Sequence, residues 1–273
     1  MPVEDERTQV KRALTRAFLR AEREFLYQVK AAFDIGFGDV ARSGACAILA
    51  MARKGDLYVA NAGDCRAVLG RHKHKSRWSS SKACSLSDDF EAVALSRDHN
   101  AREPEEQAKL RTLHPFEENI IRCKRKDSCY VKGKLQPTRS IGDAYLKFSE
   151  FNGVPGENRG RYIGPPYTPP YVSAEPEITV HSIEPGRDAF VVIASDGVWD
   201  MMSNEEVVKI VGEALARDGS FTGASDLVVK KALEVAAAHH MMAITDLQAL
   251  KAGRTRRDKH DDMTCVIMDL KQA

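Results

Sequence analysis

The sequence predicts an α+β fold, with mostly antiparallel strands and with helices packed on the outside. Three observations support this class: a long amphipathic helix pattern at the start, a series of short strands joined by tight turns, and two further helix patterns before a last strand. The chain has 273 residues, of which 43% are hydrophobic and 29% are charged, which is enough to bury a large core. Neither an internal repeat nor a low-complexity linker divides it, so we predict a single domain over residues 1–273.

The first predicted element is a helix from about Thr8 to Phe33. Its apolar residues recur mostly at four-residue steps, as on one face of an amphipathic helix. Three strands follow in the segments ACAILAMA, LYVANA and GDCRAVLGR, and the turn residues Lys54–Asp56 separate the first two. These strands indicate an antiparallel meander on which the helix can lie.

The middle of the chain alternates loops with short elements. RHKHKSRWSSSKACSLSDDF is a polar, basic stretch typical of a solvated hairpin tip, with a docking surface as the alternative. EAVALSRDHN ends an apolar run at an acid, Asp98, and Pro104 then begins a short helix. Residues 149–172 are too rich in glycine and proline for regular structure, and they predict a surface flap.

The last third predicts two helices and a strand. Ser203 followed by Glu206 is a capping box, which starts a helix that runs to about Arg217. A second helix spans about Ser225 to Met242, and HDDMTCVIMDL then leads an acid pair into a final strand.

Composition excludes several classes of function and location. Lys and Arg number 41 against 39 Asp and Glu, a net charge of about +2, so no global field recruits nucleic acid or an anionic membrane. We therefore expect no nucleic-acid and no membrane partner. No apolar run approaches the roughly 18 residues of a membrane helix, and the start MPVEDERTQV resembles neither a signal nor a transit peptide. We expect an intracellular protein, cytoplasmic or nuclear.

The cysteines carry a prediction of their own. None of them has C-x-x-C spacing, which favours free thiols in a reducing compartment over a disulfide or zinc framework. The six are Cys46, Cys65, Cys84, Cys123, Cys129 and Cys265.

Carboxylates at the ends of predicted strands are the candidate functional residues. VVIASDGVWD runs a buried strand into Asp196, and Asp200 follows four residues later. Asp98 and the pair Asp261–Asp262 also lie at strand ends. Carboxylates gathered without soft ligands suit hard cations such as Mg²⁺ or Mn²⁺. For any one acid alone, a turn or helix-capping role is the alternative.

Six motifs in this order resemble those of the metal-dependent type 2C protein serine/threonine phosphatases. They are SGACAILA, LYVANAGDCRAVL, LSRDHNAREPEE, LQPTRSIGDAYLK, VVIASDGVWDMMSNEEVV and HDDMTCVIMDL, and the similarity runs from about Ser43 to Leu270. CYVKGKLQPTRSIGDAYLK and YTPPYVSAEPEITVH are more narrowly similar to the pyruvate dehydrogenase phosphatase-like branch. The resemblance implies a β-sandwich of two antiparallel sheets flanked by helices, and a phosphorylated protein as substrate.

The resemblance also implies roles for the acids. Asp196 and Asp261 would hold a binuclear Mg²⁺ or Mn²⁺ centre, while Asp98 and Asp200 match acids that bind a further, looser metal. The metals would activate a water for in-line attack on phosphorus, without a phosphoenzyme. Asp262 stands where the family more often has Asn. Gly142 and Asp143 match a motif that we interpret as structural.

One part of the family pattern has no match in this sequence. The family carries a Glu-Asp strand and an Asp-Gly-His-Gly-Gly segment ahead of the long helix, together with a phosphate-binding Arg. We therefore expect an N-terminally incomplete domain that is partly or weakly active, and a transit peptide for the mitochondrial matrix could precede it. No catalytic residue is assigned, since His99 has no evident duty and Trp199 fits core packing. A non-catalytic pseudophosphatase or regulatory binding module is the alternative function.

Overall fold

Helix α1, Glu6–Asp34, is the first element of the described chain. The computed structural model describes residues 5–73, 89–125, 128–154 and 162–272. The helix begins where the Asp5 side chain accepts a hydrogen bond from the Thr8 amide. Its buried stripe includes Leu14, Phe18 and Val29, which confirms the helix predicted from the apolar periodicity.

A four-stranded sheet is the main sheet, with the strand order β11-β10-β4-β5. Strand β10, Asp188–Ala194, pairs antiparallel with both β4 and β11, so it lies in the interior of the sheet and is almost wholly buried. Its two partners are β4 (Arg66–His72) and β11 (Cys265–Asp269). Strand β5 (Phe90–Ala94) pairs with β4 at the edge of the sheet.

Three smaller sheets complete the strand inventory of the described residues. One has the order β2-β3-β9 and consists of Ala47–Arg53, Asp56–Ala62 and Glu177–Ser182. Another pairs β1, Gly44–Ala45, with β8, Ile141–Gly142, and the third pairs β6, Ile121–Arg125, with β7, Ser128–Val131. The antiparallel sheets and outer helices confirm the predicted α+β class.

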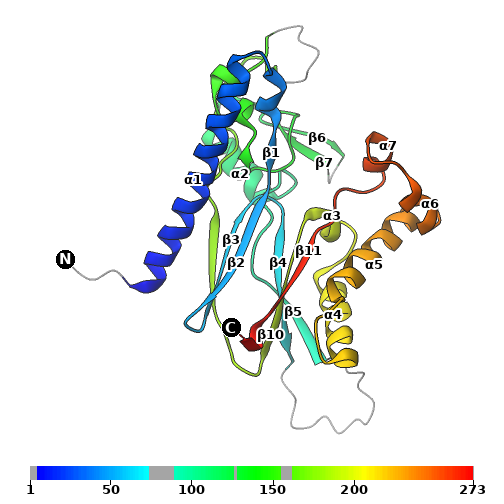
Figure 1. Cartoon of the computed structure of the whole chain (residues 1–273). Helices are drawn as coiled ribbons and strands as arrows, with labels where there is room; N and C mark the ends of the chain where they lie inside the picture. The colour runs from blue at the N-terminus through cyan, green and yellow to red at the C-terminus, as the bar shows by residue number, and fades with distance from the viewer. Residues whose placement is uncertain (1–4, 74–88, 126–127, 155–161, 273) are drawn as a thin grey trace. The chain divides into compact units, whose positions relative to one another are not determined.

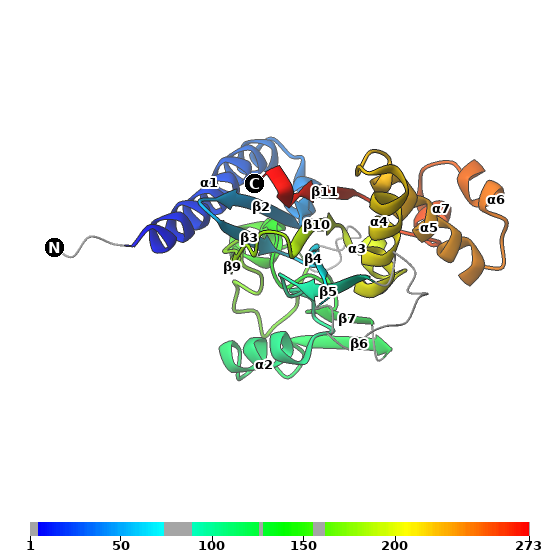
Figure 2. The ribbon, with the colours of Figure 1, turned by 90° about the horizontal axis from the view of Figure 1, so that it is seen from below.

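Two helices pack on the four-stranded sheet. Helix α4, Asn204–Asp218, contacts β4 and β5, and α5, Ala224–His239, contacts α4 and β11. Figure 2 shows α4 and α5 side by side next to this sheet. Three shorter helices are α3, Asp196–Trp199, α6, Ile244–Ala249, and α7, Arg254–Arg257. Helix α2, Pro104–Leu113, begins at the predicted proline.

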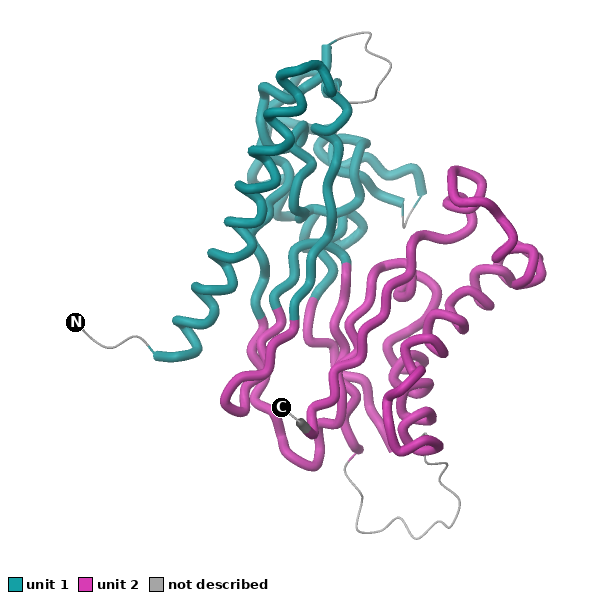
Figure 3. The backbone as a smooth tube through the Cα atoms, viewed as in Figure 1, with its two compact units in different colours: residues 1–49, 60–64, 97–178 teal, residues 50–59, 65–96, 179–273 magenta. Residues whose placement is uncertain are grey.

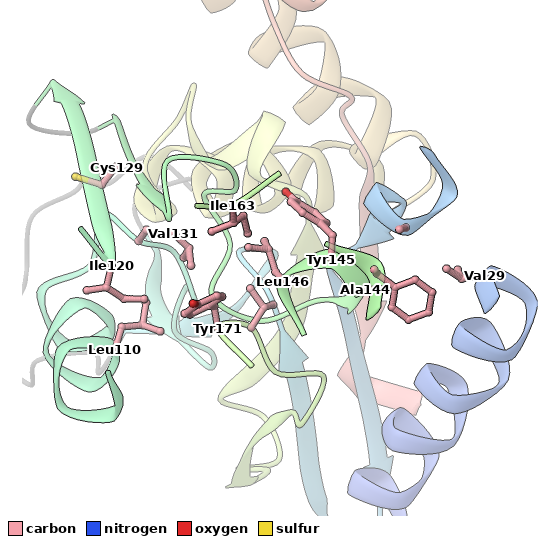
Figure 4. Packing of buried hydrophobic residues seen from close by; sticks show 14 residues of the cluster. Val29, Leu110, Ile120, Cys129, Val131, Ala144, Tyr145, Leu146, Ile163 and Tyr171 are labelled. Atoms are coloured by element: carbon pink, nitrogen blue, oxygen red, sulfur yellow. The ribbon is translucent and has the colours of Figure 1, made fainter. Parts of the chain in front are cut away.

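The chain forms two compact units, which Figure 3 colours separately. Unit 1 comprises residues 1–49, 60–64 and 97–178, and unit 2 comprises residues 50–59, 65–96 and 179–273. Each has its own hydrophobic core. Figure 4 shows the core of unit 1, where Val29 of α1, Tyr145, Leu146 and Tyr171 belong to one buried cluster. The core of unit 2 joins β10 to α3, α4 and α5.

A disulfide between Cys123 and Cys129 corrects the prediction of free thiols. These two residues are directly opposite each other in the register of the β6–β7 hairpin. The sequence test looked for C-x-x-C spacing, whereas a hairpin can bring cysteines six residues apart into contact. Cys46, Cys65 and Cys265 are not disulfide-bonded, and Cys84 lies outside the described residues.

The two loop predictions have different outcomes. Most of the basic stretch predicted as a hairpin tip falls in residues 74–88, outside the described residues. In the predicted flap, the described residues contain one 3₁₀ turn, Ser149–Phe151, and otherwise irregular backbone. Within the described part of the chain, no helix has the length and apolar character needed to cross a membrane.

Candidate functional site

The turn that follows β10 carries Asp196 and Asp200. The buried strand ends at Ala194, Ser195 is the N-cap of α3, and Asp196 is the first helical residue. The helix lasts one turn, and the Asp200 amide donates to the Asp196 carbonyl at 2.7 Å. Asp196 is half-buried and Asp200 is exposed. Both acids thus lie just beyond the end of a central strand, as the sequence predicts.

The Trp199 side chain connects this turn to the end of β10. Its side chain is 6% exposed, and its indole Nε1–H donates to the Ala194 carbonyl at 2.9 Å. The Arg66 guanidinium lies over the ring, 5.3 Å from its centroid. The tryptophan is therefore a packing residue, which agrees with the interpretation from the sequence, and it fixes the direction in which the turn leaves the sheet.

The segment before β11 is bound to the same turn. The Ser195 amide donates to the Thr264 carbonyl at 3.1 Å, and the Thr264 amide donates to Ser195 Oγ at 3.0 Å. Ser195 Oγ–H in turn donates to the Asp262 carbonyl at 3.0 Å. These bonds hold SDG and DDMT together at adjacent strand ends. We call Ser195–Asp200 with Asp261–Thr264 the SDG–DDMT junction.

Gly197 explains why the two segments approach so closely. A Cβ atom at this position would lie 2.5 Å from the Asp262 carbonyl oxygen, closer than side-chain carbons are found in proteins. Any larger residue would force the segments apart. The glycine of the SDG motif is thus required by the packing of the junction.

The two carboxylates that close the junction are exposed. Asp261 Oδ1 accepts a hydrogen bond from the Asp262 amide at 2.8 Å, and Asp261 Oδ2 lies 3.8 Å from Arg257 Nη2. Asp261 and Asp262 are both exposed. The structure therefore brings Asp196, Asp200, Asp261 and Asp262 to one junction in unit 2.

Asp98 belongs to unit 1 and is described there by itself. It lies four residues past β5, which ends at Ala94, and its side chain forms an ion pair with Arg102 at 3.2 Å. The neighbouring His99 is buried, with Nδ1 accepting from the Gly63 amide at 3.4 Å. Burial lowers the pKa of His99, and the charge of Arg139 acts in the same direction. A buried neutral imidazole fits packing better than proton transfer to a substrate.

Sequence reasoning missed a second acid in unit 1, Asp64. It is buried, accepts hydrogen bonds from Asn100 Nδ2 at 2.8 Å and from the Cys46 thiol at 3.0 Å, and lies near the charge of Asp98. Burial is the main cause that raises its pKa, and Asp98 adds to the effect. A signal was present, because GDC follows the buried strand LYVANA just as SDG follows VVIA.

The match to the predicted metal centre is incomplete. Among residues 5–73, 89–125, 128–154 and 162–272, no group of three or more His, Cys, Asp or Glu side chains converges as a metal site would require. The roles of Asp196, Asp261, Asp98 and Asp200 as metal ligands stay predictions.

The motif that we interpreted as structural has that role. Gly142 has φ of +86° and donates its amide to the buried Glu22 carboxylate at 2.7 Å. Asp143 is buried and accepts a hydrogen bond from Ser140 Oγ at 2.6 Å. Lys147 then pairs with Glu22 at 2.7 Å. This network connects α1 to β8 within unit 1.

Comparison with known proteins identifies relatives over most of the chain. Residues 3–241 match the family described as protein phosphatase 2C. The chain is 39% identical over 257 residues to probable protein phosphatase 2C 48 of Arabidopsis thaliana, which covers 94% of this chain and 62% of that protein. It is 35% identical over 257 residues to probable protein phosphatase 2C 28 of Oryza sativa subsp. japonica, covering 94% of this chain and 59% of that protein.

Solved structures give the same result for the fold. The serine-threonine phosphatase 2C from Toxoplasma gondii superposes with a TM-score of 0.58 at 15% identity, over 98% of this chain and 71% of that chain. A sex determining protein of C. elegans gives 0.57 at 19% identity, over 99% of this chain and 48% of that chain. The family predicted from the six motifs is confirmed, whereas the narrower branch stays a prediction.

Proposed function

The chain belongs to the protein phosphatase 2C family, and on this premise we propose that it takes part in hydrolysing phosphoserine and phosphothreonine in proteins. Water would add to phosphorus, and the ester oxygen would leave with a proton as the serine or threonine hydroxyl. The chain spans 62% of the length of one curated relative and 59% of another. Activity, substrate and partners are therefore proposals for this chain.

The SDG–DDMT junction is the observation that carries this proposal. Hydrogen bonds through Ser195 hold two acidic segments at adjacent strand ends, and the close approach at Gly197 leaves no room for a side chain there. Such a rigid junction presents carboxylates in fixed positions to solvent, which a turn or cap alone would not require.

Electrostatics supports a requirement for a cation. A phosphate monoester is a dianion at neutral pH, and each carboxylate within about 4 Å would repel each of its charges by about 4 kcal/mol at an effective dielectric constant near 20. Asp196, Asp261 and Asp262 would thus exclude the substrate unless a cation neutralised them. We propose that activity depends on Mg²⁺ or Mn²⁺, with Asp196 and Asp261 as the predicted ligands.

A binding module without catalysis is the second candidate. It is favoured by the lack of a three-ligand group in the described part of the chain. Under this alternative, the protein would keep the family fold and bind phosphoproteins or other partners without turnover.

Phosphate release from a phosphothreonine peptide distinguishes the two candidates. We expect release in Mn²⁺ that EDTA abolishes. Asp196→Asn and Asp261→Asn should each remove nearly all of it while the melting temperature changes little, because the amide keeps the shape of the side chain and removes its charge. Asp200→Asn should cost less when Mn²⁺ is abundant.

Two results would change the assignment. A folded and fully active Asp196→Asn protein would end the metal-ligand proposal. A wild-type protein that binds the phosphopeptide but releases no phosphate in either metal would establish the binding module instead.

A further inference from the structure

A pocket of about 560 Å³ borders the SDG–DDMT junction within unit 2. Leu233 of α5 forms part of one wall, Arg256 and Arg257 of α7 form another, and Asp261 and Asp262 line it where the chain returns to the sheet. Figure 1 shows α5, α6 and α7 in succession and the chain running from α7 into β11. A volume of this size accommodates one or two side chains of a bound peptide.

The segment that forms one side of this pocket is strongly basic. Residues 251–260, KAGRTRRDKH, contain five Lys and Arg residues against a single acid, Asp258. The chain as a whole is nearly neutral, so this charge is a local feature next to the proposed reaction centre. We call residues 251–260 the basic segment.

Arg257 is a highly exposed cation that lines the pocket. Its side chain is 78% exposed, and its distance of 3.8 Å from Asp261 Oδ2 is too long for a hydrogen bond. A guanidinium carries five N–H donors in a planar fork, which matches carboxylate and phosphate oxygens. Arg254 is exposed at the start of the same helix.

A chain of hydrogen bonds fixes the basic segment relative to Asp261. Arg256 Nε–H donates to His260 Nε2 at 3.2 Å. Nδ1 of the same ring donates to the Asp261 carbonyl at 2.7 Å. Arg256 also donates to the Leu250 carbonyl at 3.4 Å. These bonds give Arg256, which lines the pocket, a set position beside the junction.

We propose that the Arg257 side of this pocket is a substrate subsite that binds an anionic side chain flanking the phosphoresidue to be hydrolysed, while the cation proposed above neutralises the acids Asp261 and Asp262 on the other side. Carboxylate and phosphate share the oxygen geometry that the Arg257 guanidinium recognises, so the favoured substrates are acidic or multiply phosphorylated protein segments. The inference rests on the proposed function, because the flank is defined by a phosphoresidue at the SDG–DDMT junction. It deepens that function by naming the substrate class.

The test uses phosphothreonine peptides that differ only in their flanks. One set carries Glu, one carries phosphoserine and one carries Ala beside the phosphothreonine. We expect kcat/KM to be about tenfold higher for the anionic flanks, as for one well-placed charge-assisted contact. Arg257→Glu should bring this ratio close to one. Comparing Glu with phosphoserine shows which anion the subsite prefers.

Arg217→Glu is the matched control. Arg217 is an exposed arginine on α4 that pairs only with its neighbour Asp218 among the interactions the structure gives for it. The same charge reversal there should leave the preference for anionic flanks unchanged. A loss of the preference in this variant as well would mean that net charge, not the pocket, is responsible, and would overturn the proposal.

Binding measurements separate this inference from the proposed function. Fluorescence anisotropy of the same labelled peptides, without turnover, should show tighter binding of the anionic flanks and its loss in Arg257→Glu. If no peptide is hydrolysed, the proposed function fails while anisotropy still decides the subsite. Equal binding of Glu and Ala flanks, or equal competition by single-stranded DNA, would overturn the subsite.

Discussion

Glu117 is the clearest case of a single side chain that organises its surroundings. It is 3% exposed and pairs with the ammonium of Lys132 at 2.5 Å. It also accepts from the amide and hydroxyl of Thr168 and from the Tyr171 hydroxyl. One carboxylate thereby joins three segments of unit 1. They are the turn after α2, the residue that follows β7, and the irregular chain after residue 162.

We predict that Glu117→Gln destabilises the protein by about 3 kcal/mol, because breaking a buried ion pair leaves an uncompensated charge on Lys132. Glu118→Gln is the control, since its side chain is exposed next to Glu117, and it should cost less than about 0.5 kcal/mol. Urea unfolding followed by tryptophan fluorescence measures both values. Equal costs for the two variants would show that the pair contributes nothing.

The stability that Glu117 contributes should depend on pH. Burial raises the pKa of Glu117, but the hydrogen bonds from Lys132, Thr168 and Tyr171 together lower it by more. The folded pKa is therefore below the ordinary value of 4.5. Such a group contributes stability above pH 4.5, and this is lost as the pH falls through the folded pKa. The difference in unfolding free energy between wild type and Glu117→Gln should therefore shrink on acidification from pH 6 to 3. A constant difference would contradict the assignment.

The sequence predicts the positions of some acids of the candidate site, and it misses residues whose contacts involve other segments of the chain. Asp196 and Asp261 were predicted because each lies beside an apolar run, and the structure places both at one junction. Asp64 has the same pattern but was not selected, because its burial and its contacts with Cys46 and Asn100 depend on segments distant in sequence. The Cys123–Cys129 pair depends on hairpin register, which spacing alone does not reveal.

Among the elements, α4 shows how much local sequence can determine. Ser203 Oγ accepts from the Glu206 amide at 3.2 Å, and the Glu206 carboxylate accepts from the Ser203 amide at 2.8 Å. This is the reciprocal capping box predicted from the two residue types and their spacing. Both bonds are local, so the sequence suffices to place the start of the helix.

Removing the cap should be measurable in the whole protein. We predict that Ser203→Ala costs about 1 kcal/mol, because the Glu206 amide loses its partner, whereas Ser203→Thr keeps an acceptor oxygen and costs less than half of that. Thermal melts of the two variants against wild type provide the comparison. If threonine proves as costly as alanine, crowding rather than the lost hydrogen bond is the cause.

The sequence analysis does not predict the short helices α6 and α7, although α7 lies within the basic segment of the proposed subsite. They have six and four residues, too few to show a helical period, and isolated helices of this length are not stable. In α6, the fully buried Leu247 packs in a cluster with Ala236 and Ala237 of α5. Tertiary packing therefore determines these elements, and a charge count along residues 251–260 was the only local signal.

At the scale of the whole molecule, the two compact units are interleaved along the chain. Three of the boundaries between them fall inside strands, at residues 49–50 in β2, 59–60 in β3 and 178–179 in β9. Strands β2, β3 and β9 each contribute residues to both ranges. The single domain predicted from the sequence stays a prediction.

We therefore predict one cooperative unfolding transition, in which calorimetric and van't Hoff enthalpies agree. Leu146→Ala in unit 1 and Leu69→Ala in unit 2 are a matched pair, because both leucines are fully buried. Each should cost about 2–5 kcal/mol and lower the temperature of the same transition by roughly 5–10 °C. Differential scanning calorimetry of the two variants and wild type tests this. If each substitution instead shifted a separate peak, the units would unfold independently, and the chain would contain two domains.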